Sequence, residues 1–74
     1  MDKSIYSKDH KFVTEQLRKA RIHAGLGQEQ TAKLLGKTQS YISKIESGQR
    51  RIDIVQLKEF ARIYKKDFNF FIKQ

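Results

Sequence analysis

The 74-residue sequence contains no cysteine and no proline, and it has only four glycines. Without cysteine, neither disulfide bonds nor thiolate metal ligands can supplement a core of this size. His10 and His23 stand apart from any cluster of further ligand residues, so we expect no metal and no other cofactor. No apolar run approaches the roughly 20 residues that span a bilayer, and the N-terminus lacks the apolar segment of a signal peptide. We therefore expect a cytoplasmic, nucleoid-associated protein with no membrane partner.

The residue groups of common catalytic sites are missing as well. The sequence has no histidine–carboxylate cluster, no cysteine nucleophile and no phosphate-binding glycine loop. A helical domain of this length is also too small to enclose a substrate easily. We expect no enzymatic activity, and nothing in the sequence indicates a small-molecule ligand.

Basic residues are in excess, with 16 Lys and Arg against 8 Asp and Glu, which gives a net charge of +8. Such an excess favours a polyanionic partner, because phosphates that are neutralised by the protein release their counterions. Charge alone is equally typical of an RNA-binding protein, a membrane-surface module or a merely soluble basic protein. The residue pattern has to decide between these classes.

Apolar residues recur at helical spacing along most of the chain, and no segment alternates with the period of a strand. We predict an all-α fold of five short helices in residues 9–74, after an N-terminal arm of residues 1–8. Ser7 or Asp9 is expected to cap the first helix, and Asp53 and Asp67 the last two. The positions expected to face the core are Val13, Leu17, Ala20, Ala24, Ala32, Leu35, Ile42, Ile45, Ile54, Leu57, Phe60, Ala61, Tyr64, Phe68 and Phe71.

The most informative segment is 28–47, with the sequence QEQTAKLLGKTQSYISKIES. It predicts two short helices joined by a turn at Gly36, with Thr38 as the N-cap of the second helix. Helices that cross steeply over so short a turn approach closely, and Ala32 supplies the small side chain at that contact. Ile42 and Ile45 anchor the second of these helices to the core and leave its opposite face free.

That free face is polar and contains no acidic residue between positions 38 and 45. Glutamine and lysine side chains read base edges in the major groove, and serine contacts bases or phosphates. The residues expected to contact bases are Gln39, Ser40, Tyr41 and Lys44. Those expected to contact the DNA backbone are Gln28, Ser43, Ser47, Gln49, Arg50 and Arg51. An ordinary solvated helix face is the alternative for any one of them taken singly.

From about Phe12 to Ile72 the chain resembles the lambda-repressor/Cro family of bacterial and phage regulators, also called the XRE family. The resemblance is best in LRKARIHAGLGQEQTAKLLGKTQSYISKIESGQRRI. It implies a five-helix DNA-binding domain in which helices two and three form the helix-turn-helix, with Gln28 on a phosphate. It also implies a structural ion pair between Arg21 and Glu46 that holds the recognition helix at its angle.

The chain departs from the family pattern at four positions. Thr31 stands where leucine is usual, Ile52 replaces a common proline, and Lys65 occupies a position often held by glycine. Tyr41 is large for a recognition face. It packs either on DNA, against the backbone or a thymine methyl group, or on the protein's own surface.

Members of this family usually bind palindromic sites as two-fold dimers, so we expect double-stranded DNA and a second copy of the chain as partners. Val55, Ile63 and Phe70 do not fit the inward stripes of the last two helices and are the candidates for the dimer interface. Scattered exposed apolar residues are normal, however. In the N-terminal arm, Lys3 and Lys8 are expected either to follow the DNA backbone or to belong to a mobile terminus.

The predicted function is a sequence-specific transcriptional regulator, either a repressor or a restriction-modification-type controller. The alternative is a protein-interaction module on the same fold, such as an antitoxin or a phage or polymerase adaptor. A pure adaptor has no need for an acid-free helix face followed by Arg50 and Arg51.

Overall fold

The computed structural model describes residues 8–72 of the chain. Its helices are α1 (Lys8–His23), α2 (Gln28–Leu35), α3 (Gln39–Glu46), α4 (Ile54–Tyr64) and the 3-10 helix η2 (Phe68–Phe71). The all-α prediction is confirmed, and no strand occurs among the described residues. The fifth predicted helix is a single 3-10 turn, in which the Asp67 carboxylate accepts a hydrogen bond from the backbone N–H of Asn69 at 2.8 Å.

The connection between α2 and α3 has the turn chemistry that the sequence predicted. Gly36 ends α2 in the left-handed conformation, with φ 67°, which glycine adopts without steric cost. The hydroxyl oxygen of Thr38 then accepts a hydrogen bond from the backbone N–H of Tyr41 at 3.1 Å and caps α3. Local chemistry alone therefore fixes the boundaries of both helices.

Helix α4 begins with a reciprocal capping box that compensates for the absent proline at position 52. The Asp53 carboxylate accepts a hydrogen bond from the Gln56 N–H at 2.7 Å, and the Gln56 side-chain oxygen accepts one from the Asp53 N–H at 2.9 Å. The helix ends at Lys65, which has φ 56° and is the one non-glycine residue with positive φ among the described residues. A lysine thus occupies the left-handed position where the family often has glycine.

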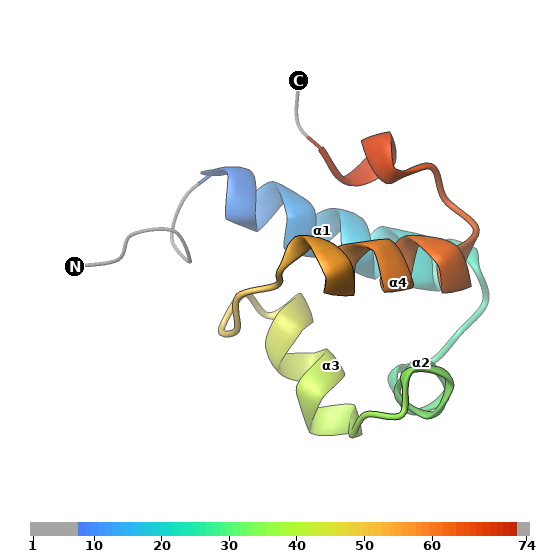
Figure 1. The fold of residues 1–74 in the computed structure, drawn as a ribbon. Coiled ribbons are helices and arrows are strands. Elements are labelled where there is room, and N and C mark those ends of the chain that lie inside the picture. Colours follow the sequence, from blue (N-terminus) through green and yellow to red (C-terminus); the bar gives the residue numbers. More distant parts are fainter. Residues whose placement is uncertain (1–7, 73–74) are drawn as a thin grey trace.

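Helix α4 lies in front of α1 in Figure 1 and contacts it, with η2 on one side of them and the α2–α3 pair on the other. The same figure shows α2 end-on and α3 from the side, so the two helices cross steeply. Helix α1 contacts α3, α4 and η2, and α2 contacts α3. This arrangement leaves α3 at the edge of the molecule, with one side on the core and the other toward solvent.

The core draws on all five helices. Its buried apolar side chains are Leu17, Ala20, Ala32, Ile42, Ile45, Leu57, Phe60, Ala61, Tyr64 and Phe71. Val13, Leu35 and Phe68 are partly buried and pack against it. None of the helices in residues 8–72 is long and apolar enough to cross a membrane.

Four sequence expectations about the fold were wrong or fall outside the described part. Ala24 is exposed because it lies in the turn after α1, and Ile54 is 61% exposed because the first turn of α4 extends beyond the core. Asp9 is the second residue of α1 and therefore is not its N-cap. Lys8 already belongs to α1, whereas Ser7 and the rest of the predicted arm lie outside the described residues.

Candidate nucleic-acid interface

Helix α3 presents a polar face to solvent because its apolar residues point inward. Ile42 and Ile45 are completely buried, at 0% exposure each. The predicted contact residues Gln39, Ser40, Ser43 and Lys44 are all exposed on the other side of the helix. The structure therefore places these four side chains together on one accessible surface.

An ion pair between Arg21 and Glu46 ties the end of α3 to α1, as the family resemblance implied. Arg21 donates to the carboxylate through Nε at 2.7 Å and Nη2 at 3.1 Å, and its Nη1 donates to the Leu26 carbonyl at 2.9 Å. The two side chains are only 13% and 6% exposed. The hydrogen bond with Glu46 raises the pKa of Arg21 above its usual value, against the opposing effect of burial. A bidentate pair with so little solvent contact restrains the orientation of α3.

A chain of side-chain hydrogen bonds leads from this ion pair to the exposed surface. The Gln28 amide nitrogen donates to Glu46 Oε1 at 3.2 Å, and the Gln39 amide nitrogen donates to the Gln28 amide oxygen at 3.4 Å. Because a carboxylate only accepts hydrogen bonds, Gln28 must turn its NH₂ group inward and its oxygen toward Gln39. Both glutamines were predicted from the sequence as DNA-contacting residues, but their contact with each other was not predicted.

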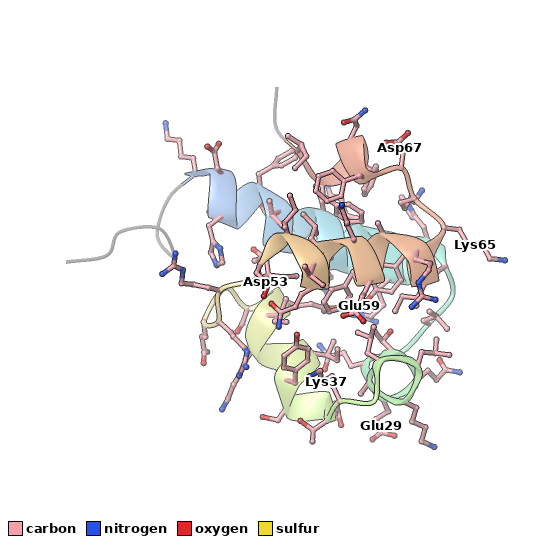
Figure 2. The ribbon with its side chains drawn as sticks, in the orientation of Figure 1. Glu29, Lys37, Asp53, Glu59, Lys65 and Asp67 are labelled. Carbon is pink, nitrogen blue, oxygen red and sulfur yellow. The ribbon has the colours of Figure 1, made fainter. Side chains whose placement is uncertain are left out.

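Tyr41 packs on the protein's own surface, which is one of the two positions that the sequence left open. Its side chain is half-buried, and its hydroxyl oxygen accepts a hydrogen bond from the Gln56 amide nitrogen of α4 at 2.8 Å. The Lys37 ammonium and the Arg50 guanidinium lie over its ring, at 5.2 and 4.9 Å from the centroid. Burial raises the pKa of Tyr41, although the positive charge of Arg50 opposes the rise. Figure 2 labels Lys37 next to α3.

Lys37 and Gln56 belong to this surface, but sequence reasoning missed both. Lys37 precedes the N-cap of α3 and adds a cation directly beside the recognition helix. Gln56 follows Asp53 at the spacing of a capping box, so its place at the start of α4 was readable from the sequence. Its contact with Tyr41 was not, because it depends on how α3 and α4 pack.

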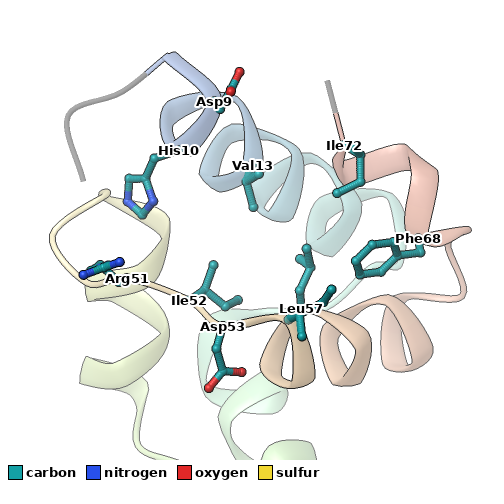
Figure 3. A pocket seen from close by; sticks show the side chains of 10 residues that line it. Asp9, His10, Val13, Arg51, Ile52, Asp53, Leu57, Phe68 and Ile72 are labelled. Atoms are coloured by element: carbon teal, nitrogen blue, oxygen red, sulfur yellow. The ribbon is translucent and has the colours of Figure 1, made fainter. Parts of the chain in front are cut away.

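The basic residues that follow α3 diverge. Arg50 lies over Tyr41, whereas Arg51 lies beside His10 at the rim of a separate groove (Figure 3). Ser47 is exposed and donates its hydroxyl hydrogen to the Lys44 carbonyl at 3.2 Å. Gln49 is also exposed, and its backbone N–H donates to the same carbonyl at 2.9 Å. Arg50 and Arg51, which the sequence predicted to contact the DNA backbone, therefore line separate surfaces of the molecule.

The groove beside Arg51 has a volume of about 380 Å³ and is mainly apolar. Figure 3 shows Val13, Ile52, Leu57, Phe68 and Ile72 around it, contributed by α1, the segment between α3 and α4, α4 and the C-terminal segment. Asp9 and His10 at the start of α1 also line it, and none of its lining residues belongs to α3.

The three dimer candidates do not share one exposed surface. Val55 is 65% exposed, but Ile63 and Phe70 are partly buried and pack against the core. Phe70 also makes an edge-on contact with Phe71, at a ring-centroid distance of 5.2 Å. The exposed apolar residues near Val55 are instead Ile54 and, across the groove, Ile72, which is 38% exposed.

No group of three or more metal-ligating side chains occurs within residues 8–72. No curated protein matches the chain. A helix-turn-helix family model, HTH_3, matches residues 17–71, which covers the C-terminal part of α1 and all of α2, α3, α4 and η2. The chain therefore belongs to the helix-turn-helix family of the lambda-repressor, or XRE, type.

Proposed function

We propose that the protein is a sequence-specific transcriptional regulator that reads the major groove of double-stranded DNA with α3. Membership in the helix-turn-helix family indicates DNA as the partner. The proposal that α3 reads specific bases rests on the chain of hydrogen bonds that begins at the ion pair of Arg21 with Glu46 and ends on the exposed amide of Gln39. A side chain oriented before binding is what direct readout of a base requires.

The free hydrogen-bonding groups of Gln39 match adenine. One amide hydrogen of Gln39 is directed at Gln28, which leaves the second hydrogen and the amide oxygen for a base. Adenine presents an acceptor at N7 and a donor at N6 in the major groove, and a glutamine amide pairs with both. Ser40 and Lys44 are proposed to contact neighbouring bases. Gln28, whose amide is half-buried beside Glu46, is proposed to contact a phosphate through the N-terminal end of α2.

The remaining exposed polar and basic residues after and along α3 are proposed to contact the DNA backbone. These are Ser43, Ser47, Gln49, Arg50 and Arg51. Contacts to the backbone fix the register of the protein on the duplex but carry no sequence information.

We further propose that the protein acts as a homodimer through the first turn of α4. A single recognition helix of eight residues reads only a few base pairs, so a second copy on a palindromic site supplies the missing specificity. Val55 and Ile54 are more than half exposed, and Ile54 lines the apolar groove, which a partner surface would cover. Val55→Asp is expected to shift sedimentation toward the monomer, whereas Ile22→Asp on α1 serves as a control at another exposed apolar site. A dimer that survives Val55→Asp at low micromolar concentration would remove this surface from the proposal.

The function is tested by selecting bound duplexes from a random DNA library at about 0.15 M salt, which suppresses non-specific electrostatic binding. Recovery of a palindrome with two short half-sites is expected. Repeating the selection with Gln39→Ala is expected to relax one position of each half-site and leave the others unchanged. Recovery of no motif by the wild-type chain contradicts sequence-specific binding and favours a protein partner on the same fold.

A further inference from the structure

A second basic surface lies on the flank of α3, beside the face that carries Gln39. It is a hollow of about 440 Å³ between the α2–α3 turn, α3 and residue 50. We call it the basic hollow, and its side chains are Lys37, Thr38, Ser40, Tyr41, Lys44 and Arg50. Three of these six side chains are cationic and none is acidic.

The three cations of the basic hollow form no ion pair within the described part of the chain, although the negative charges of Asp53 and Glu59 lie close enough to Tyr41 to raise its pKa. The ion pair found in residues 8–72 joins Arg21 to Glu46 and involves none of them. Lys37, Lys44 and Arg50 are all exposed. Three positive charges around one hollow, with no carboxylate among its lining residues, create a site that favours an anion.

Tyr41 forms the wall over which two of these cations are held. Lys37 and Arg50 both lie within 5.2 Å of the ring centroid, where the negative face of an aromatic ring attracts cations and offsets their mutual repulsion. The ring is fixed in turn by the hydrogen bond from Gln56 to its hydroxyl oxygen, and Gln56 is fixed by the capping box with Asp53. A rigid helix start therefore orients two charged side chains that would otherwise move freely in solvent.

In this arrangement both the ring and the hydroxyl group of Tyr41 are already in contact with other residues, so few of its groups can contact a base. Its ring carries Lys37 and Arg50, and its hydroxyl oxygen already accepts a hydrogen bond from Gln56. The groups that remain open toward the hollow are N–H and O–H donors, from Lys37, Lys44, Arg50 and the Ser40 hydroxyl. A phosphate group accepts hydrogen bonds through its free oxygens and carries the complementary charge.

We propose that the basic hollow binds one backbone phosphate of the DNA, with Lys37 and Arg50 as ligands and Tyr41 as the residue that positions them. The proposal rests on the proposed function, because it assumes that α3 lies in the major groove. Under this proposal Tyr41 does not read a base but supports a phosphate contact that is independent of the DNA sequence. The proposal also adds Lys37 to the residues that contact DNA. Gln56 acts through Tyr41 as a second positioning residue.

The test measures DNA affinity against salt concentration for Lys37→Ala, Tyr41→Leu and Tyr41→Phe. Each variant is measured on the selected operator and on operators that carry single base-pair changes. Lys58→Ala is the control, since Lys58 is exposed on α4 and does not line the basic hollow. Loss of one phosphate contact is expected to lower the slope of log K against log salt by about 0.9 and the affinity about five-fold at 0.15 M salt. Lys37→Ala should show this loss equally on every operator.

The tyrosine variants separate positioning from base reading. Tyr41→Phe keeps the ring and is expected to retain most of the affinity. Tyr41→Leu is expected to weaken binding to all operators about equally, and Lys37→Ala is expected to add little further loss in that background. Lys37→Ala and Arg50→Ala change exposed side chains and are therefore expected to fold. Their affinities and salt slopes can be compared with those of the wild type even if Tyr41→Leu fails to fold.

Two results would overturn the proposal while leaving sequence-specific binding intact. In the first, Lys37→Ala behaves like Lys58→Ala in both affinity and salt slope. In the second, Tyr41→Phe or Tyr41→Leu changes the preference at a single base pair, which is the signature of base reading. A wild-type chain that binds no duplex overturns the proposed function as well, and this result is visible before any variant is made.

Discussion

Arg21 and Glu46, which are 25 positions apart in the sequence, are joined by two hydrogen bonds of 2.7 and 3.1 Å with little exposure to solvent. This pair connects the last turn of α1 to the last turn of α3. Helix α3 is too short to be rigid by its own hydrogen bonds, since isolated helices of fewer than about 12 residues are marginal in water. Its orientation therefore depends on contacts of this kind.

Glu46→Gln is expected to lower the free energy of unfolding by about 2–4 kcal/mol, because it leaves the Arg21 charge partly buried without its partner. Urea denaturation at neutral pH measures the loss, and Glu15→Gln, at an exposed position of α1, is the control. A loss within about 0.5 kcal/mol of the control, the usual range for surface changes, would show that the pair contributes little to stability.

Gln39→Ala is expected to cost about 1–3 kcal/mol of discrimination at one base pair, since a bidentate contact to adenine is lost. Gln28→Ala is expected to weaken preference at the same base pair by a smaller amount, because Gln39 then loses the hydrogen bond that orients it. Competition binding with single-substituted operators measures both. Asn69→Ala, an exposed amide on η2, should change nothing. If Gln39→Ala weakens all operators equally, Gln39 does not read a base.

Because of Tyr64, the free energy of unfolding is expected to fall as the pH rises above 10. Burial raises the pKa of Tyr64 to about 12, from the ordinary value of 10.0, and the neighbouring Thr31 opposes part of the rise. Below pH 10 the residue is protonated in both the folded and the unfolded chain, so its contribution is fully present. Between pH 10 and 12 only the unfolded chain loses the proton, and stability falls by about 1.4 kcal/mol per pH unit.

Tyr64→Phe removes this dependence. Within the described residues, the hydroxyl groups of Tyr64 and Thr31 are buried without a hydrogen bond of normal length and geometry. Removing the Tyr64 hydroxyl is therefore expected to leave stability at pH 7 unchanged or to raise it by up to about 1 kcal/mol. Denaturation at pH 7 and pH 11 measures both effects. If the free energy of unfolding falls equally for the wild type and the variant between these pH values, the raised pKa of Tyr64 is contradicted.

Lys65→Gly is expected to stabilise the domain by about 0.5–1 kcal/mol, because Lys65 ends α4 with φ 56° and glycine adopts this conformation without steric cost. For a domain of this size the melting temperature should rise by about 2–8 °C. Lys65→Gln, which removes the charge and keeps the side chain, separates the two effects. A similar rise for Lys65→Gln would assign the gain to charge and not to backbone conformation.

The local features of the fold were readable from the sequence because neighbouring residues produce them. Gly36 and Thr38 predicted the end of α2 and the start of α3, and Asp53 predicted the start of α4. The period of 3.6 residues placed Ile42 and Ile45 in the core. That same period placed Ile54 inward, wrongly, because periodicity tells which residues share a face but not how far that face extends over the core.

The errors at the C-terminal end have a similar cause. Ile63 and Phe70 lie off the inward stripes of their own elements, yet both pack against the core. η2 folds back onto α1, and the Gln16 amide nitrogen donates to the Phe70 carbonyl at 2.9 Å. A side chain that looks exposed on one helix is covered when another element lies over it, and the pattern along one helix does not contain that information.

The sequence by itself determined the all-α class, the helix boundaries around Gly36, the net positive charge and the polar face of α3. These depend on backbone conformation, capping and the helical period, which act over a few residues. Only the tertiary structure decided that Gln39 contacts Gln28, that Tyr41 contacts Gln56, and that Arg50 and Arg51 diverge. Such contacts depend on the angle and rotation at which separate helices pack, and these are set by the shapes of many buried side chains together.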